Sequence, residues 1–338
     1  MKHKHSTLFI IIAVLVLACG GAALWAWNLL GAQYEYEKIR VEIPAGSTTA
    51  DVQRYLIDAL GQDFGSKVYQ IWSLKDGSPE RAHGSYLVEP GTTALTLAKA
   101  LYNGRQTPVK LTFNNIRTMG ELAARVATVM EFDSAAFMQA CDSVLPGFGF
   151  DRAGYPAAFL PDTYEFYWTA APQKVVNTLV DTRNKFWNDE RRAKAAKLGL
   201  TPVQVTTVAT IVEEETNKAD ERPKVARLYL NRLDRKMPLQ ADPTVKFAVG
   251  DFSLRRITGA HLAVESPYNT YKAPGLPPGP IRVAERSAID AVLDAPQHDY
   301  LYMCAKSDFS GYHDFAADYN RHRINAARYH RALNKRGI

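Results

Sequence analysis

The stretch TPVQVTTVATIVEEET, residues 201–216, is the one around which we expect the fold to be organised. It opens with Thr201 and Gln204 at capping-box spacing and with proline at the first helical position, which together signal a helix start. Val205, Ala209 and Val212 then recur at helical spacing on one face. The sequence therefore predicts a packed helix that ends in three consecutive glutamates.

The three glutamates at the end of this helix cannot all face the same way. At about 100° per residue, Glu215 lies about 60° from the centre of the apolar stripe, Glu213 about 100° and Glu214 about 160°. We expect Glu215 to point most nearly inward, where the cost of ionisation raises its pKa. A raised pKa is what a general acid needs near neutral pH. The alternative is a solvated run of glutamates that pairs with Lys218 or Arg222.

The region after this helix predicts a second helix and then a series of stiff polar loops. The helix is expected to begin near Asp220, with proline tolerated in its first turn. Its packed face holds Val225, Leu228, Tyr229 and Leu233. The loops combine proline and glycine with Asn, Gln and Tyr, and neutral hydrogen-bonding groups beside aromatic faces suit a sugar better than a phosphate. Each loop alone is more often a plain turn, so the combination is what indicates a saccharide site.

Upstream, a strand, a Pro/Gly turn and a helix occur twice in succession. VEIPAGSTTA at 41–50 is echoed by VEPGTTA at 88–94, and we predict helices at 49–60 and about 95–101 and a strand at 109–113. Small units of this kind are similar to the LysM type of glycan-binding module, and they also serve as plain scaffold. We therefore expect a LysM-like, membrane-proximal subdomain over residues 35–113, with binder and scaffold both open.

Residues 114–338 are expected to form the catalytic domain, of mixed α+β class. Helical periodicity is present at 118–130, 134–141 and 173–187, and a strongly aromatic segment lies at 159–168. A late strand at 300–302 is followed by GYHDF at 311–315. The whole chain is therefore predicted to be α+β, with an apolar helix ahead of the two folded parts.

The N-terminal segment reads as an uncleaved membrane anchor. Residues 8–30 carry no charge, and at about 1.5 Å per residue they span about 35 Å, enough for a hydrocarbon core of roughly 30 Å. Lys2 and Lys4 precede the span, so we expect residues 1–7 to be a cytoplasmic stub and the rest to be periplasmic, at the inner membrane. Aromatic residues mark the outer interface: Trp25, Trp27, Tyr34 and Tyr36. The alternative is a cleaved signal, for which the Ala18-Cys19 step offers a faint site.

Composition and charge exclude some classes of function. The chain has 338 residues, of which 46% are hydrophobic and 22% charged, as is usual for a globular protein. The net charge of +6 is accounted for by the segment 321–338, which predicts a basic terminal helix rather than a nucleic-acid surface. Its packed face is expected to hold Ile324, Ala327 and Leu333. The basic face is either solvated or attracted to anionic lipid or cell-wall carboxylates.

Cysteine and histidine usage predicts neither a metal site nor a disulfide framework. Cys19, Cys141 and Cys304 lie far apart, although a Cys141–Cys304 pair stays open. The histidines lack the HExxH pattern of a metal hydrolase. We expect no metal and no cofactor.

Short motifs occur in order along the second half of the chain: IVEEET at 211–216, Glu221-Arg222, Asn231-Arg232-Leu233, LQADPT at 239–244, SPYNTY at 266–271 and GLPPGPI at 275–281. Together with the anchor, the PDTY element at 161–164 and the C-terminal segments, they closely resemble the YceG-like family of endolytic murein transglycosylases. The resemblance implies a lyase that cleaves the bond between N-acetylmuramic acid and N-acetylglucosamine without water and leaves a 1,6-anhydro end.

The resemblance also implies roles for individual residues and partners. The catalytic glutamate of the family falls on Glu215, the residue that helix geometry also selects. Substrate contacts are implied for Asn231, Gln240, Asp242, Thr244, Tyr268, Asn269, Tyr271 and His313. The implied partners are nascent peptidoglycan strands, the cytoplasmic membrane and peptidoglycan synthases, with the enzyme ending strand polymerisation during cell-wall biogenesis.

Two other functions fit the same residues. A glycoside hydrolase would pair Glu215 with Asp242 or Glu221 and activate water. A membrane-anchored glycan-binding protein without catalytic activity would use the same loops. The mass of the product distinguishes the first, and survival of binding in a Glu215→Gln variant distinguishes the second.

Overall fold

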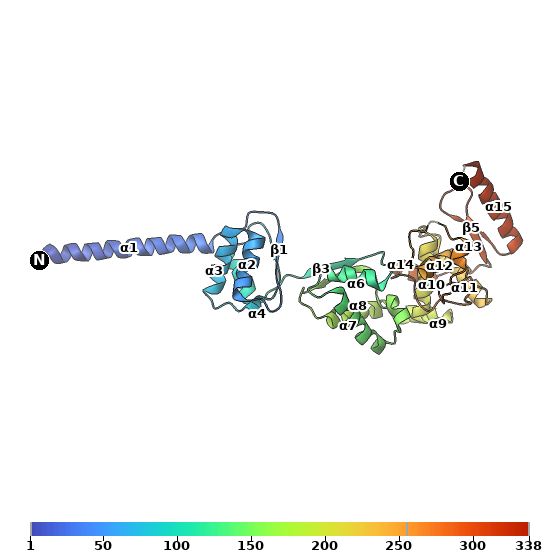
Figure 1. Ribbon diagram of the computed structural model, residues 1–338, viewed down its shortest axis with the longest axis horizontal. Coiled ribbons are helices and arrows are strands. Elements are labelled where there is room, and N and C mark those ends of the chain that lie inside the picture. The colour runs from blue at the N-terminus through green and yellow to red at the C-terminus, as the bar shows by residue number, and fades with distance from the viewer. Residues whose placement is uncertain (1, 255, 337–338) are drawn as a thin grey trace. The chain divides into compact units, whose positions relative to one another are not determined.

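The computed structural model describes residues 2–254 and 256–336, with side chains from residue 10 onward, and it divides the chain into two compact units (Figure 1). Unit 1 comprises Met1–Lys110, Val129–Glu131 and Glu165–Ala170. Unit 2 comprises Leu111–Thr128, Phe132–Tyr164 and Ala171–Ile338. Both contain helices and short antiparallel strand pairs, so the predicted α+β class is confirmed. The functional division into residues 35–113 and 114–338 stays a prediction, and residues 1, 337 and 338 of the expected stub and basic tail lie outside the described residues.

Unit 1 begins with a long apolar helix, α1 (Lys2–Leu30). Its residues Ile10–Leu30 have a mean hydropathy of 2.3, and by length and composition they are able to cross a membrane. Branched side chains along it, such as Val14 and Val16, are exposed at 59% and 64%. Such a surface is costly in water, which is consistent with an anchor, and a signal sequence has the same properties.

The body of unit 1 is an antiparallel strand pair covered by helices. Strands β1 (Ile39–Ile43) and β2 (Gly84–Val88) pair, and the helices are α2 (Thr49–Leu60), α3 (Gln62–Ser73), α4 (Pro79–Ala82) and α5 (Ala94–Tyr102). The predicted helices at 49–60 and 95–101 are confirmed, and Thr48 and Asp51 form a capping box at the start of α2. Helix α3 was missed by the sequence analysis. The two predicted strand–helix units share one sheet and one core, and the LysM likeness stays a prediction.

The next part of the chain forms a short sheet and a pair of packed helices. Strand β3 (Val109–Phe113) pairs with β4 (Asp162–Phe166), and the ring of Phe113 stacks on that of Tyr164 with centroids 5.5 Å apart. Between and after these strands lie α6 (Met119–Ala127), α7 (Ser134–Val144), the 3-10 helices η1 (Leu145–Phe148) and η2 (Arg152–Ala158), α8 (Pro172–Phe186) and α9 (Asp189–Lys197). The aromatic segment at 159–168 therefore contains strand β4, and its rings are buried in the core except that of Tyr167, which is 57% exposed.

The centre of unit 2 is α10 (Pro202–Glu215), the helix predicted from its caps (Figure 1). Thr201 and Gln204 form the expected capping box. Helices α11 (Arg222–Asp234) and α14 (Arg286–Leu293) pack against α10. Every residue from Val205 to Glu213 is buried, so α10 has no solvent-exposed face over that length. The predicted packed helix is therefore confirmed, and its burial extends beyond the apolar stripe because neighbouring elements also cover the other faces.

The C-terminal part of unit 2 adds short helices and a hairpin capped by a helix. The elements are α12 (Asp242–Val249), α13 (Gly259–Leu262), the antiparallel strands β5 (Tyr302–Ala305) and β6 (His313–Ala316), and α15 (Tyr319–Lys335). The segment 239–244, expected to be a loop, begins α12 at Asp242. Cys141 and Cys304 are both free thiols, so the possible pair is not formed.

Helix α15 packs against the hairpin with a different face from the one predicted. Ile324 is 53% exposed and Ala327 is also exposed, whereas Asn325 is 4% exposed. The ring of His322 stacks on Tyr302 of β5. Aromatic contacts with the hairpin thus decide the orientation of α15, and the sequence alone does not show which surface this helix packs against.

Candidate active site

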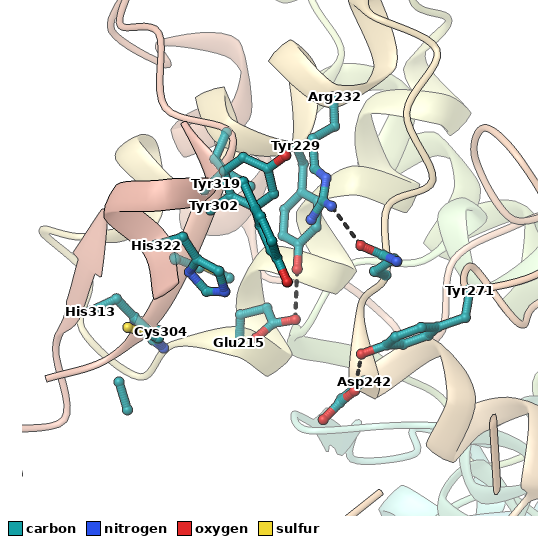
Figure 2. A pocket seen from close by; sticks show the side chains of 14 residues that line it. Glu215, Tyr229, Arg232, Asp242, Tyr271, Tyr302, Cys304, His313, Tyr319 and His322 are labelled. Atoms are coloured by element: carbon teal, nitrogen blue, oxygen red, sulfur yellow. Dashed lines mark hydrogen bonds between the residues drawn. The ribbon is translucent and has the colours of Figure 1, made fainter. Parts of the chain in front are cut away.

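A pocket of about 370 Å³ opens in unit 2 where α10 ends, and Glu215 lies on its wall (Figure 2). Helices α11 and α15, strands β5 and β6, and the segments around residues 240 and 271 supply the other walls. The lining residues are Glu215, Leu228, Tyr229, Arg232, Gln240, Asp242, Tyr271, Tyr302, Met303, Cys304, Ala305, His313, Tyr319 and His322. Most of these side chains are polar or aromatic, which is typical of a site for a sugar.

Glu215 is the last residue of α10 and is partly exposed to the pocket. The hydroxyl of Tyr229, from α11, donates a hydrogen bond to its Oε1 at 2.7 Å (Figure 2). Burial raises the pKa of Glu215, against the opposing effects of the Tyr229 hydrogen bond and the nearby His313. Glu215 therefore holds its proton to a higher pH than an ordinary carboxyl group does, as a general acid requires.

The other two glutamates of the run belong to an ion-pair cluster outside this pocket. Glu213 is 5% exposed, accepts a hydrogen bond from the backbone N–H of Glu285 at 3.0 Å and lies 3.1 Å from Nη2 of Arg282. Glu214 pairs with Nη1 of the same arginine at 2.5 Å, and with Arg117 at 3.5 Å.

This cluster corrects two expectations about the glutamate run. Glu213, and not Glu215, is the residue that points most nearly into the core, because the segment 281–285 covers the side of α10 that the apolar stripe leaves free. The alternative of a solvated run that pairs with Lys218 or Arg222 is also wrong, because Glu213 and Glu214 pair with Arg282 and Arg222 pairs with Glu285 at 2.9 Å.

Four of the predicted substrate-contact residues line the pocket: Gln240, Asp242, Tyr271 and His313. The Tyr271 hydroxyl donates to Oδ1 of Asp242 at 2.7 Å, so these two side chains hold each other at one rim (Figure 2). Gln240 has a positive φ of 52° and accepts a hydrogen bond from Nη2 of Arg232 at 2.7 Å. Hydrogen bonds therefore hold these polar side chains of the pocket in fixed positions.

His313 is oriented by a buried carboxylate behind it. Its Nδ1 lies 2.9 Å from Oε2 of Glu221, and its backbone N–H donates to Oε1 at 2.8 Å. Glu221 is 6% exposed and also accepts a hydrogen bond from the hydroxyl of Thr216 at 3.1 Å. These bonds occupy Glu221, which does not line the pocket, and they fix the imidazole ring that does.

The other four predicted contacts lie outside the pocket lining and are engaged with other parts of the protein. Asn231 donates to the carbonyls of His298 and Tyr300, at 2.6 and 3.0 Å. Asn269 donates to two carbonyls of the preceding loop, both at 2.9 Å, while Thr244 is buried against Thr270. The ring of Tyr268 packs against Phe247. Their direct contact with substrate stays a prediction.

Several pocket residues were missed by the sequence analysis: Tyr229, Arg232, Tyr302, Tyr319 and His322. Helical spacing places Tyr229 on the packed face of α11, and the need of a buried tyrosine hydroxyl for a partner is a usable signal. Arg232 stands in the motif Asn231-Arg232-Leu233, which is also a usable signal. The sequence gives no such signal for Tyr302, Tyr319 and His322, because β5 and α15 reach the pocket only through the tertiary fold. Within residues 2–254 and 256–336, no group of three or more His, Cys, Asp or Glu side chains is arranged to hold a metal ion.

Two relatives of known name are similar to this chain, one of them over most of its length. A Bacillus subtilis protein named endolytic murein transglycosylase is 27% identical over 317 residues, which cover 86% of each chain. A Streptococcus pneumoniae protein of the same name is 30% identical over 149 residues, 43% of this chain and 27% of the relative.

Comparisons of structure and family lead to the same group. The crystal structure of a putative YceG-like protein from Listeria monocytogenes has a TM-score of 0.57 and 26% identity, covering 85% of this chain and 98% of its own. The model of the YceG-like family matches residues 41–328, which include parts of both units and the whole Glu215 pocket. The chain therefore belongs to the YceG-like family.

Proposed function

We propose that this protein is a lytic transglycosylase that cleaves peptidoglycan glycan strands, with Glu215 as both acid and base. The observation that carries the proposal is the placement of Glu215: a carboxyl group with a raised pKa at the wall of a polar and aromatic pocket. The names of the relatives in Bacillus subtilis and Streptococcus pneumoniae support the same activity.

The proposed reaction needs one carboxyl group and no water. Glu215 donates its proton to O4 of the leaving N-acetylglucosamine while the bond between C1 of N-acetylmuramic acid and O4 breaks. The carboxylate then accepts the proton of the muramyl 6-hydroxyl as O6 bonds to C1. Glu215 returns to its starting state, and the new end is a 1,6-anhydro-muramyl residue. Tyr229 stabilises the transient carboxylate by its hydrogen bond.

The apolar helix indicates where the reaction takes place. With α1 as a single-pass anchor of the inner membrane and the N-terminus in the cytoplasm, both folded units lie in the periplasm. The substrate there is the nascent strand that synthases extend at the membrane surface. We propose that the enzyme ends such strands and works beside those synthases, and that unit 1 holds the strand in the manner of a LysM-like module.

A second candidate is a hydrolase with two carboxylates, because Asp242 lines the same pocket and its charge contributes to raising the pKa of Glu215. Glu221 is a weaker partner, since its oxygens are bound by Thr216 and His313. The two candidates differ in whether an oxygen atom from water enters the product.

We expect the full-length protein in detergent to release glycan ends one water lighter than hydrolytic ends, measured by mass spectrometry of purified strands. When the reaction takes place in water enriched in heavy oxygen, the new glycan ends should contain none of that heavy oxygen. Label at the new ends would establish the hydrolase instead. Binding of strands without any cleavage would establish a glycan-binding protein.

Tyr229→Phe is expected to move the basic limb of the profile of kcat/KM against pH to higher pH. The Tyr229 hydroxyl favours the ionised form of Glu215, so its loss raises the pKa of that carboxyl group further. Glu215 then keeps its catalytic proton to higher pH. Tyr271→Phe is the matched control, because its hydroxyl donates to Asp242. A basic limb that stays in place in Tyr229→Phe would show that another group titrates there.

A further inference from the structure

Arg232 is a buried cation on the pocket wall, and no carboxylate of the described residues pairs with it. The residue is 8% exposed, and its guanidinium donates to the carbonyl of Leu239 at 3.2 Å and to Oε1 of Gln240 at 2.7 Å, both neutral acceptors. Its Nε has no hydrogen-bond partner among the described residues. Burial of such a charge without a counter-ion is unfavourable, and it lowers the pKa of Arg232.

A second polar side chain, that of His322, lies on the same wall. Nδ1 of His322 is buried and has no hydrogen-bond partner within the part of the chain that the structure describes. Its ring stacks on Tyr302 at 5.3 Å between centroids, and the guanidinium of Arg232 lies 5.6 Å from that same Tyr302 ring. The Tyr302 ring thus contacts both groups, and all three residues line the Glu215 pocket (Figure 2).

Other buried arginines of unit 2 show what is unusual here. Arg227 lies on the same helix, is 5% exposed, and pairs with Asp234 at 2.8 Å. Arg282 pairs with two glutamates. Arg183 also bonds to neutral acceptors, but it lies against the rings of Phe150 and Trp187 and does not line the pocket. Arg232 differs from these three arginines because it lines a pocket, and this pocket is large enough for an anion to reach it.

We propose that Arg232 and His322 bind a carboxylate carried by the muramyl residue of the strand, and that this contact selects which glycosidic bond is cut. The inference rests on the proposed function. Guanidinium is the preferred partner of carboxylates in buried sites, and the imidazole of His322, which lines the same wall, supplies a second donor. The Tyr302 and Tyr319 rings provide apolar surface for the sugar beside this anion site.

The selection follows from the chemistry of the polymer. A glycan strand alternates two sugars through similar linkages, so a single catalytic carboxyl group cannot distinguish one linkage from the next. Only the muramyl residue carries a lactyl ether, which ends either in a carboxylate or in a peptide stem with carboxylates of its own. A cation fixed to one side of Glu215 places C1 of the muramyl residue, and not C1 of its neighbour, at the catalytic proton.

The test compares three strand preparations of equal length with the full-length protein in detergent. The first is stem-free with lactyl carboxylates, the second is the same material with those carboxylates converted to amides, and the third carries peptide stems. We expect kcat/KM to be about 10- to 100-fold higher for the preferred carboxylate form than for the amide, the range for a hydrogen-bonded charge in a buried site. Preference for the first or the third preparation identifies the lactyl or the stem carboxylate as the ligand.

Arg232→Gln should bring the ratio of carboxylate to amide close to one, mainly through a higher KM on the carboxylate strands. Arg227→Gln is the matched control, because it removes an equally buried guanidinium of the same helix and should leave the ratio unchanged. A purely structural role for Arg232 would lower activity on all strands alike. Arg232→Lys, which keeps a charge, serves if the glutamine variant does not fold.

The ratio of kcat/KM on carboxylate strands to that on amide strands, measured with the wild-type protein, tests the carboxylate site independently of any variant. Equal cleavage of carboxylate and amide strands would overturn the carboxylate site while leaving the transglycosylase proposal intact. Failure to cleave any strand would instead contradict the proposed function itself.

Discussion

Glu215→Gln is expected to lower the rate of strand cleavage by at least about 10³-fold, within the range for loss of a general acid–base group and towards its upper end because one residue serves both steps. Glutamine keeps the size of the side chain and accepts the hydrogen bond from Tyr229, but it neither donates the required proton nor takes one back. The measurement is initial cleavage rate on purified strands, together with strand binding, which should survive.

Glu214→Gln is the control for this prediction. Glu214 is one residue away, pairs with Arg282 and Arg117 and does not line the pocket, so cleavage should stay within about threefold of wild type, the few tenths of a kcal/mol typical of a partly exposed pair. Equal loss in both variants would place the catalytic group elsewhere.

The stability of Glu215→Gln provides an independent check on its folding. The folded-state pKa of Glu215 is raised above its ordinary value of 4.5, so ionisation of this residue costs the folded state stability as pH rises past that value. Glutamine removes the cost. The variant should therefore be at least as stable as wild type at neutral pH. The difference in stability should vanish below about pH 4, where Glu215 is protonated in both the folded and the unfolded wild-type protein.

Arg282→Met is expected to lower the free energy of unfolding of unit 2 by about 3–5 kcal/mol, the usual cost of breaking a buried ion pair from one side. The guanidinium is 7% exposed and contacts Glu213, Glu214 and Asn115. Without it, the N–H of Glu285 is the one hydrogen-bond partner that Glu213 keeps among the described residues. Methionine fills much of the same volume, so lost packing contributes little.

The measurement is urea unfolding near neutral pH, followed by a signal from unit 2. Burial already raises the pKa of Glu213, so the loss should shrink at acid pH, where that carboxyl group becomes neutral. Arg286→Met is the control, because Arg286 and Asp162 are 37% and 43% exposed and such pairs contribute about 0–1 kcal/mol. Equal effects of the two substitutions would refute a special role for the buried cluster.

Features that depend on neighbouring residues were predicted well. The capping boxes fix where α2 and α10 begin, because a cap satisfies backbone groups within three residues of itself. The apolar helix over residues 8–30 and the helices at 49–60 and 173–187 follow from spacing and length in the same way. The motifs around Glu215 were also sufficient to indicate the family, which the match over residues 41–328 shows.

Features that depend on distant segments were not available from the sequence. Helical spacing shows only the apolar stripe of α10, but α11, α14 and the segment 281–285 also cover the helix, and the contact with that segment, more than 70 residues away in the chain, places Glu213 in the core. The Tyr302 ring of β5 stacks on His322 and so decides which face of α15 points inward. His322 and Tyr319 thereby reach the Glu215 pocket, although both lie more than 100 residues from Glu215 in the chain. Local periodicity determined that these helices exist. Only the tertiary packing decided which of their side chains meet, because burial is a property of the surface that each helix encounters.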